Sequence, residues 1–136
     1  MKIAVSAVGN TLEAQVDRRF GRCAYFLIVD SETLEFDAFS NEASSAMGGA
    51  GIQAAQMIAK KEAKVVITGN VGPNAYGTLS AAGIEVITGA SGTIREAVEK
   101  YKKGELKKTG APTVKGHFGM GGGQGQGQGQ GQGRQR

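Results

Sequence analysis

The chain has 136 residues, of which 40% are hydrophobic, and this length and composition suit one domain with one hydrophobic core. The single cysteine, Cys23, excludes an intrachain disulfide framework and cannot alone supply the thiolates of an enclosed iron–sulfur or zinc site. We therefore expect a reducing compartment. Because the apolar run at residues 1–8 is too short to span a membrane and lacks a cleavage pattern, we expect a cytoplasmic protein without a membrane partner.

The formal net charge of +4 is distributed unevenly along the chain. Residues 1–99 carry 8 Lys and Arg against 11 Asp and Glu, whereas residues 100–136 carry 8 against 1. The basic groups therefore belong to the C-terminal end, which argues against a basic binding face built into the fold.

The N-terminal part of the chain predicts three strands. Residues 2–8 form the first strand, which ends at the breaker pair Gly9-Asn10. The apolar residues 23–30 and the alternating residues 34–40 flank a short turn, which predicts an antiparallel hairpin with one solvent-facing side. This hairpin should form an edge of the sheet.

The remainder predicts helices that alternate with strands. Small residues precede the first helix, Pro73 begins the second, and Thr93 with Glu96 forms a capping box at the third. Helices are expected over residues 52–61, 73–82 and 94–103, and strands over residues 64–68 and 84–88.

The order β-β-β-α-β-α-β-α predicts an α/β domain in which helices cover both faces of a mixed five-stranded sheet with an antiparallel hairpin arm. The composition then changes, and residues 116–133 are mainly glycine and glutamine. Such a segment buries too little apolar surface to offset its ordering entropy. We therefore expect a domain over residues 1–108 and a disordered basic tail over residues 109–136.

Ligands of open α/β sheets bind beyond the carboxyl ends of the parallel strands, where the strand order reverses. Successive backbone N–H groups in two glycine-rich loops, residues 48–51 and 69–72, each lead into a helix there and would suit an anion. The alternative is that these glycines serve tight turns and close packing, and neither loop is a nucleotide fingerprint. The candidate binding residues from these loops and the end of the first strand are Ser6, Asn10, Gly48, Gly49, Gly51, Thr68, Gly69, Asn70, Gly72 and Asn74.

A second candidate binding element lies at residues 17–23, with the sequence DRRFGRC. Its three arginines would attract an anion and offer planar donor groups, while the Phe-Gly pair could shield one side and allow close backbone approach. The alternative is a solvated basic loop. The residues with these roles are Arg18, Arg19, Phe20, Gly21 and Arg22.

Three side chains could ligate a soft or borderline metal, namely Cys23, Met47 and His117. Arg22 could lower the pKa of the neighbouring Cys23 thiol and so favour the thiolate. A buried, structural role for Cys23 and a packing role for Met47 are the alternatives, and His117 lies in the expected tail.

Four segments resemble one known family: DRRFGRCAYFLIVD at residues 17–30, GGAG at 48–51, VITGNVGPNA at 66–75 and GIEV at 83–86. They are similar to the dinitrogenase iron–molybdenum cofactor biosynthesis family, the group of NifX, NifY and NifB C-terminal domain-like proteins, over residues 1–108. The resemblance implies a ribonuclease-H-like fold and the carrying or storage of iron–sulfur or molybdenum-containing clusters as cargo.

Two departures from this family pattern qualify what the resemblance implies. Members often have histidine before the Phe-Gly pair, and Arg19 at that position favours electrostatic holding of an anionic cluster over direct ligation. The cysteine cluster of the radical enzyme in some relatives is absent, so synthesis of the cofactor is not predicted.

The sequence lacks the residue arrangements that the enzymatic functions considered for such a fold require. Two-metal nuclease chemistry needs converging carboxylates, and Asp17, Asp30 and Asp37 are too scattered to form such a pair. No Ser-His-Asp or Cys-His arrangement with an orienting group is present either. We therefore expect a non-catalytic protein.

The basic tail leaves two alternatives open. A nucleic-acid-binding module is disfavoured because the tail has two arginines, both at its extreme end, and one aromatic residue, Phe118. An iron–sulfur assembly or storage particle could form if the Gly-Gln repeats self-associate. The main hypothesis is reversible binding of an anionic iron–sulfur or iron–molybdenum-type cluster, exchanged with a donor or acceptor protein.

Overall fold

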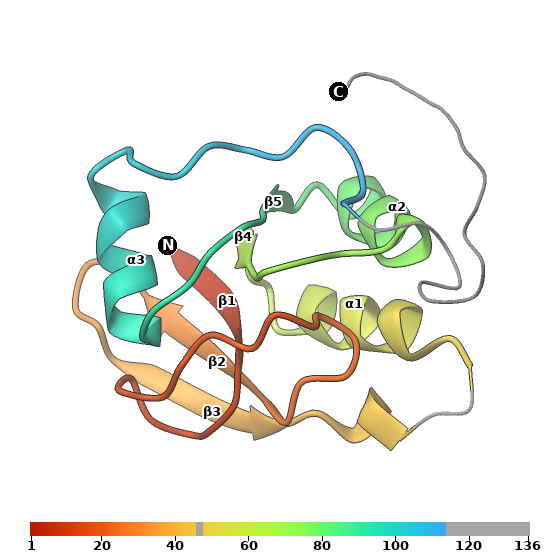
Figure 1. The fold of residues 1–136 in the computed structure, drawn as a ribbon, viewed down its shortest axis with the longest axis horizontal. Helices are drawn as coiled ribbons and strands as arrows, with labels where there is room; N and C mark the ends of the chain where they lie inside the picture. Colours follow the sequence, from red (N-terminus) through yellow and green to blue (C-terminus); the bar gives the residue numbers. More distant parts are fainter. Residues whose placement is uncertain (46–47, 114–136) are drawn as a thin grey trace.

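The computed structural model describes residues 1–45 and 48–113 (Figure 1). The strands are β1 (Lys2–Ala7), β2 (Tyr25–Asp30), β3 (Phe36–Ser40), β4 (Val65–Ile67) and β5 (Glu85–Ile87). The helices are α1 (Ala50–Lys60), α2 (Pro73–Ala81), α3 (Ile94–Lys102) and the short 3-10 helix η1 (Glu42–Ser45). The expected order of elements is confirmed.

The five strands form one mixed sheet in the order β3-β2-β1-β4-β5. The pairs β1–β2 and β2–β3 are antiparallel, whereas β1–β4 and β4–β5 are parallel. The hairpin therefore occupies one side of the sheet and the βαβ units the other, as expected. The strand order reverses at β1 and β4, and the carboxyl ends of the parallel strands share one edge of the sheet.

Helices cover both faces of this sheet, with α1 and α2 on one face and α3 on the other (Figure 1). Alternation along the strands divides the core accordingly, because successive side chains point to opposite faces. In β1, Ala4 packs in the layer of α1 and α2, whereas Ile3 and Val5 pack in the layer of α3. The domain thus has three layers and two apolar interfaces.

The hairpin departs from its expected form in two respects. β2 is buried on both faces, and only β3 is exposed, because β2 lies inside the sheet while β3 is an edge strand. β3 also begins two residues late. The Asp30 carboxylate accepts hydrogen bonds from the N–H groups of Glu32 and Thr33, and Leu34 has a φ of 64°, so the turn extends to Glu35.

Two further boundaries affect the candidate site. α1 begins at Ala50 after Gly49, which has a φ of 71°, so half of the expected 48–51 loop belongs to the helix. β2 begins at Tyr25, so Cys23 precedes the strand that was expected to contain it. Ala50 and Gly51 therefore belong to the first turn of α1, and Cys23 belongs to the segment that precedes β2.

The two outer edges of the sheet differ. Residues 105–113, which we name the C-terminal strap, run from α3 past β5 toward α2 (Figure 1). The Thr109 N–H donates to the Val86 carbonyl at 2.7 Å, and the Thr113 N–H donates to the Val71 carbonyl at 2.8 Å. The expected boundary at residue 108 thus falls within a segment that is hydrogen-bonded to the domain.

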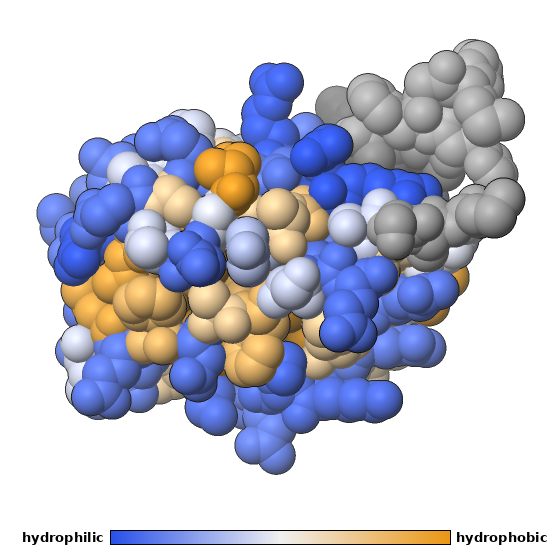
Figure 2. Space-filling view, turned by 90° about the horizontal axis from the view of Figure 1, so that it is seen from below, coloured by the Kyte–Doolittle hydropathy of each residue, from blue (hydrophilic) through white to orange (hydrophobic). Residues whose placement is uncertain are grey.

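The opposite edge is formed by β3, whose residues are mostly exposed. Figure 2, which views the molecule from this side, shows an apolar band between hydrophilic margins, and Phe36 at the start of β3 is 39% exposed.

Among the described residues, no helix is both long and apolar enough to cross a membrane.

The capping box at the start of α3 is confirmed, and its contribution to the stability of the domain can be measured. The Thr93 Oγ1 accepts from the Glu96 N–H at 3.1 Å, and the Glu96 carboxylate accepts from the Thr93 N–H at 2.8 Å. We expect Thr93→Ala to lower the free energy of unfolding by about 1 kcal/mol, because the Glu96 N–H loses its acceptor. Thr93→Ser should retain wild-type stability. Urea denaturation followed by circular dichroism measures both, and equal stability of the Ala and Ser variants would contradict the assignment.

Candidate functional site

The loops that follow β1 and β4 in the sequence lie side by side beyond the carboxyl edge of the sheet. We name residues 18–22 the arginine loop and residues 68–72 the β4 loop. The Asn70 N–H donates to the Arg18 carbonyl at 2.8 Å, and the Phe20 N–H donates to the Asn70 carbonyl at 3.4 Å. This pairing extends the sheet and brings together two of the segments singled out in the sequence.

The pairing depends on a glycine in the β4 loop. A Cβ atom at Gly69 would lie 2.6 Å from the Arg18 Cα and 3.0 Å from its carbonyl oxygen. Contacts that short with backbone cannot be relieved by a side-chain rotation. The arginine loop can therefore approach the β4 loop only because position 69 has no side chain.

The N-termini of α1 and α2 converge next to the arginine loop. A Cβ atom on Gly21 would lie 2.9 Å from the Gly51 backbone nitrogen, and one on Gly51 would lie 3.1 Å from the Ala75 Cβ. Gly51 is in the first turn of α1, and Ala75 is in the first turn of α2. The positive ends of two helix dipoles therefore meet at the arginine loop.

These two helix starts differ from that of α3. The N-cap residues are Gly49 for α1 and Gly72 for α2, so neither cap provides a side-chain acceptor, and neither first turn contains an acidic residue. By contrast, α3 has both a capping side chain and Glu96. The first-turn N–H groups of α1 and α2 therefore lack the protein acceptors that α3 has, which suits an external anion.

Backbone donors of the β4 loop itself are less available than the sequence indicates. The Asn70 N–H is used by Arg18, and the Val71 N–H donates to the Thr113 hydroxyl at 2.8 Å. The expected run of free N–H groups over residues 69–72 is therefore interrupted. The exposed Asn70 and Asn74 side chains and the start of α2 remain as donors on this side of the site.

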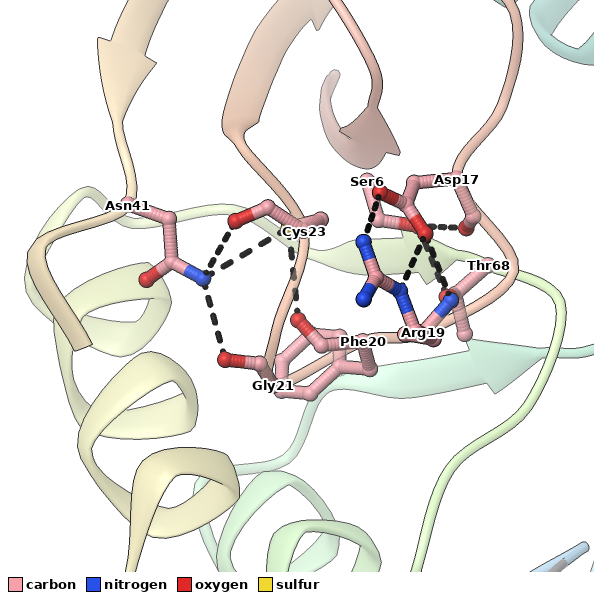
Figure 3. A network of polar contacts seen from close by, with 8 residues as sticks. All are labelled: Ser6, Asp17, Arg19, Phe20, Gly21, Cys23, Asn41 and Thr68. Carbon is pink, nitrogen blue, oxygen red and sulfur yellow. Dashed lines mark hydrogen bonds and ion pairs between the residues drawn. The ribbon is translucent and has the colours of Figure 1, made fainter. Parts of the chain in front are cut away.

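The three arginines are all exposed but differ in their partners. The Arg19 side chain, 67% exposed, bonds through Nε and Nη2 to the two carboxylate oxygens of Asp17, each at 3.2 Å (Figure 3). This hydrogen bonding and the charge of Asp17 raise the pKa of Arg19. The Arg22 Nη1 donates to the Ser44 carbonyl at 2.8 Å, which directs Arg22 toward η1.

Two hydroxyl residues expected to bind a ligand lie beneath this surface. Ser6 and Thr68 are fully buried, and their hydroxyl oxygens are 2.7 Å apart. The Ser6 hydroxyl also donates to the Asp17 carbonyl at 2.7 Å. They join β1, the end of β4 and the segment that leads to the arginine loop, so their position is that of a scaffold.

Phe20 lies inside the core and does not flank an open site. It is 2% exposed, and its ring centroid lies 5.2 Å from that of Phe26. The expected shielding role is therefore wrong for this conformation, because the aromatic ring anchors the arginine loop in the layer of α1 and α2.

The Cys23 thiol is fully buried and donates to the Phe20 carbonyl at 3.3 Å. Burial, and secondarily the negative charge of Asp17, raise the pKa of Cys23 to about 12. The expected lowering of this pKa by Arg22 is wrong. The thiol is surrounded by apolar core residues, while the guanidinium reaches Ser44 instead.

Asn41 is a site residue that the sequence reasoning missed. Only 2% exposed, it donates through Nδ2 to the Gly21 carbonyl at 3.1 Å and to the Cys23 carbonyl at 2.9 Å (Figure 3). Its Oδ1 accepts from the Ala43 N–H. The only sequence signal was an asparagine directly after a strand, which indicates a turn but not a partner 20 residues away.

The remaining predicted site residues are not brought into this cluster. Asn10 lies on a loop whose Leu12 and Ala14 carbonyls accept from the first N–H groups of α3, on the other face of the sheet. Met47 and His117 lie outside the described residues. Within residues 1–45 and 48–113, no group of three or more His, Cys, Asp or Glu could hold a metal ion.

A depression of about 600 Å³ lies at the opposite end of the sheet. Its lining includes Lys2 but also three carboxylates, those of Asp30, Glu35 and Asp37. This acidic lining does not suit an anion, so the depression is not the candidate site. The exposed glycines Gly48 and Gly49, by contrast, lie at the start of α1 and belong to the arginine-loop side.

The close approach at Gly69 predicts a specific loss of stability. We expect Gly69→Ala to lower the free energy of unfolding by about 1–3 kcal/mol, because its Cβ would overlap Arg18 backbone. Gly77→Ala is the matched control. It lies inside α2 with open space around its Cβ position and should raise stability by about 0.4–1 kcal/mol. Urea denaturation compares them, and similar stabilities for both variants would contradict the argument.

The raised pKa of Cys23 predicts an unreactive thiol. At about pH 8.5, iodoacetamide should label Cys23 only after unfolding, because the thiolate is the nucleophile. This pKa lies above the ordinary value of 9.0, so the contribution of the neutral thiol to folding stability is complete below pH 9.0 and is lost as the pH rises toward 12. Mass spectrometry measures the labelling, and equal rates for folded and urea-unfolded protein would contradict burial.

Comparison with known proteins identifies relatives of similar length. Residues 1–104 match the family described as dinitrogenase iron-molybdenum cofactor. An uncharacterized protein of Methanocaldococcus jannaschii is 33% identical over 111 residues, which cover 79% of this chain and 91% of the relative.

Solved structures share the fold. The orange protein of Desulfovibrio gigas, in its apo form, is 41% identical with a TM-score of 0.80, over 82% of this chain and 95% of that chain. A NifB-like protein from Thermotoga is 34% identical with a TM-score of 0.69, over 79% and 91% of the two chains. The chain thus belongs to the dinitrogenase iron–molybdenum cofactor family.

Proposed function

We propose that this domain binds and carries an anionic metal–sulfur cluster as cargo and catalyses no reaction. One observation carries the proposal: the positive N-termini of α1 and α2, both without capping side chains, converge beside the exposed arginine loop. A negative ligand there would accept hydrogen bonds from backbone and guanidinium groups together.

The distribution of arginine and lysine supports this location. Arg18, Arg19 and Arg22 lie at the carboxyl edge of the sheet. Lysines before β4 and at the ends of α1 and α3 lie at the opposite edge, because these helices run antiparallel to the parallel strands. Arginine offers several N–H donors in a fixed plane and is more weakly hydrated than lysine. Arginine therefore suits an extended anion with many weak acceptors better than lysine, whose ammonium group is a compact point charge.

The mode of holding follows from the groups that are present. Cys23, the only thiol, is buried and protonated, so it does not ligate in this conformation. Charge and hydrogen bonds would therefore hold the cluster at its surface, with Arg19 in the position before the Phe-Gly pair. Such binding is reversible, as delivery between a donor and an acceptor protein requires. A reducing cytoplasm would protect both the cluster and the thiol.

The nature of the cargo rests on the family and on a relative. The family is named for the iron–molybdenum cofactor of dinitrogenase. The orange protein has been solved in an apo form, which is the form of a protein that has a ligand to lose. We therefore propose an iron–sulfur or iron–molybdenum-type cluster as the ligand of this chain.

We also propose that the domain is of the ribonuclease-H-like class, which the family resemblance implies and with which the observed hairpin and parallel strands, in the order β3-β2-β1-β4-β5, are consistent. A nuclease of that class would need converging carboxylates. Here the Asp17 carboxylate, in the segment that leads to the arginine loop, is paired with Arg19. The proposal of a non-catalytic carrier is consistent with that engagement.

Anaerobic reconstitution with iron, sulfide and optionally molybdate, followed by desalting, metal analysis and visible absorption, tests the proposal. We expect Arg18→Gln and Arg22→Gln each to weaken retention of the cluster about tenfold, because a charge-assisted hydrogen bond contributes about 1.5–3 kcal/mol.

Arg95→Gln is the matched control, since it removes the same charge from α3, where Arg95 pairs with Glu13 at 2.7 Å. It should retain wild-type loading. Metal at background level in the wild-type protein would overturn the carrier proposal. Equal weakening by all three variants would show a general charge effect and overturn the assignment of the site.

A further inference from the structure

The C-terminal strap ends on the β4 loop through a cluster of hydrogen bonds. The Thr113 N–H donates to the Val71 carbonyl at 2.8 Å. The Thr113 Oγ1 accepts from the Val71 N–H at 2.8 Å and lies 3.2 Å from the Val71 carbonyl oxygen, to which it donates. One threonine thus satisfies both backbone polar groups of Val71, at a separation of 42 residues in the sequence.

These bonds place three segments side by side beyond the sheet. Within the β4 loop, the Asn70 backbone bonds the arginine loop, and the backbone of the next residue, Val71, bonds Thr113. Val71 is itself 1% exposed and packs in the layer of α1 and α2. The β4 loop is therefore fixed from both sides and from below, immediately before the Gly72-Pro73 start of α2.

The outer end of the strap is fixed independently. The Thr109 Oγ1 accepts from the Thr88 N–H at 3.1 Å and lies 2.6 Å from the Thr88 hydroxyl, while the Tyr76 hydroxyl donates to the Thr109 carbonyl at 3.3 Å. The strap thus has two threonine anchors, one after β5 and one on the β4 loop. Only the second bonds the backbone of the β4 loop, whereas the first bonds Thr88 and the Tyr76 side chain of α2.

We propose that Thr113 is a positioning residue of the cluster site, which makes the C-terminal strap part of the binding machinery. By holding Val71, it fixes the backbone between Asn70, which pairs with the arginine loop, and the first turn of α2. Thr113 contacts no ligand in this scheme. The inference rests on the proposed function, because it assigns the affinity of that same site partly to the strap.

The Val71 N–H is the backbone donor that the Thr113 hydroxyl fixes. In the hydrogen-bonded arrangement it is unavailable to a ligand, so its bond to Thr113 serves geometry alone. Loss of the Thr113 hydroxyl would leave this N–H without its acceptor and let the loop sample other conformations. A site that must match an extended anion loses affinity when its donors are not held in place.

The experiment compares Thr113→Val, Thr113→Ala and Thr113→Ser with Thr109→Val as the matched control. The probe is the cluster formed by anaerobic reconstitution with iron, sulfide and molybdate. We expect the Val and Ala variants to retain the cluster roughly tenfold less well, and the Ser variant, which keeps the hydroxyl, to restore retention. Thr109→Val should leave retention unchanged.

A second measurement separates positioning from general stability. Hydrogen exchange of the Val71 amide, followed by NMR in the cluster-free protein, should accelerate in Thr113→Val and Thr113→Ala but not in Thr113→Ser or Thr109→Val. Melting temperatures should fall by similar amounts in Thr113→Val and Thr109→Val, because each variant loses a hydroxyl that accepts one backbone N–H, from Val71 and from Thr88 respectively.

The outcomes distinguish the two proposals. Wild-type protein without metal above background would overturn the carrier function and this inference together. Normal wild-type loading with equal loading of Thr113→Val would overturn the positioning role alone. Equal weakening by Thr113→Val and Thr109→Val would also overturn it, since the strap would then act only through stability.

Discussion

The backbone pairing of Asn70 with Arg18 is the interaction on which the rest of this site depends. It forms where the strand order reverses, so the chain that leaves β1 and the chain that leaves β4 run together past the sheet. Only a glycine at position 69 permits it. This contact also places Gly21 against Gly51 in the first turn of α1. The β4 loop leads directly into the start of α2.

This arrangement has a consequence for the choice of donors. Fixing a loop by hydrogen bonds consumes its own N–H groups, as at Asn70 and Val71, so a rigid loop cannot also be a free anion cradle. The protein separates the two tasks. Buried polar residues, among them Ser6, Thr68 and Asn41, hold the backbone from inside, while arginine side chains and helix starts remain at the surface.

The sequence predicted those features that depend on local pattern. The strands, the helices, the α3 capping box and the two glycine-rich helix starts follow from spacing and turn chemistry. Features that depend on distant contacts were missed or misjudged. The pKa of Cys23 depends on burial, the partner of Asn41 lies 18 to 20 residues away, and the Thr113 bond spans 42 residues. Such contacts become visible only when the sheet order places the segments together.

The helix starts differ in how far protein groups satisfy their first turns, and under the proposed function this difference would exchange stability for binding. At α3, on the far face, Thr93 and Glu96 satisfy the first turn and stabilise the helix. At α1 and α2, glycine occupies the N-cap, which forgoes that stabilisation at two positions that lie against each other. A bound anion would supply the missing acceptors. Binding of the cargo would then also stabilise the first turns of α1 and α2, and the cluster-loaded domain would be the more stable form.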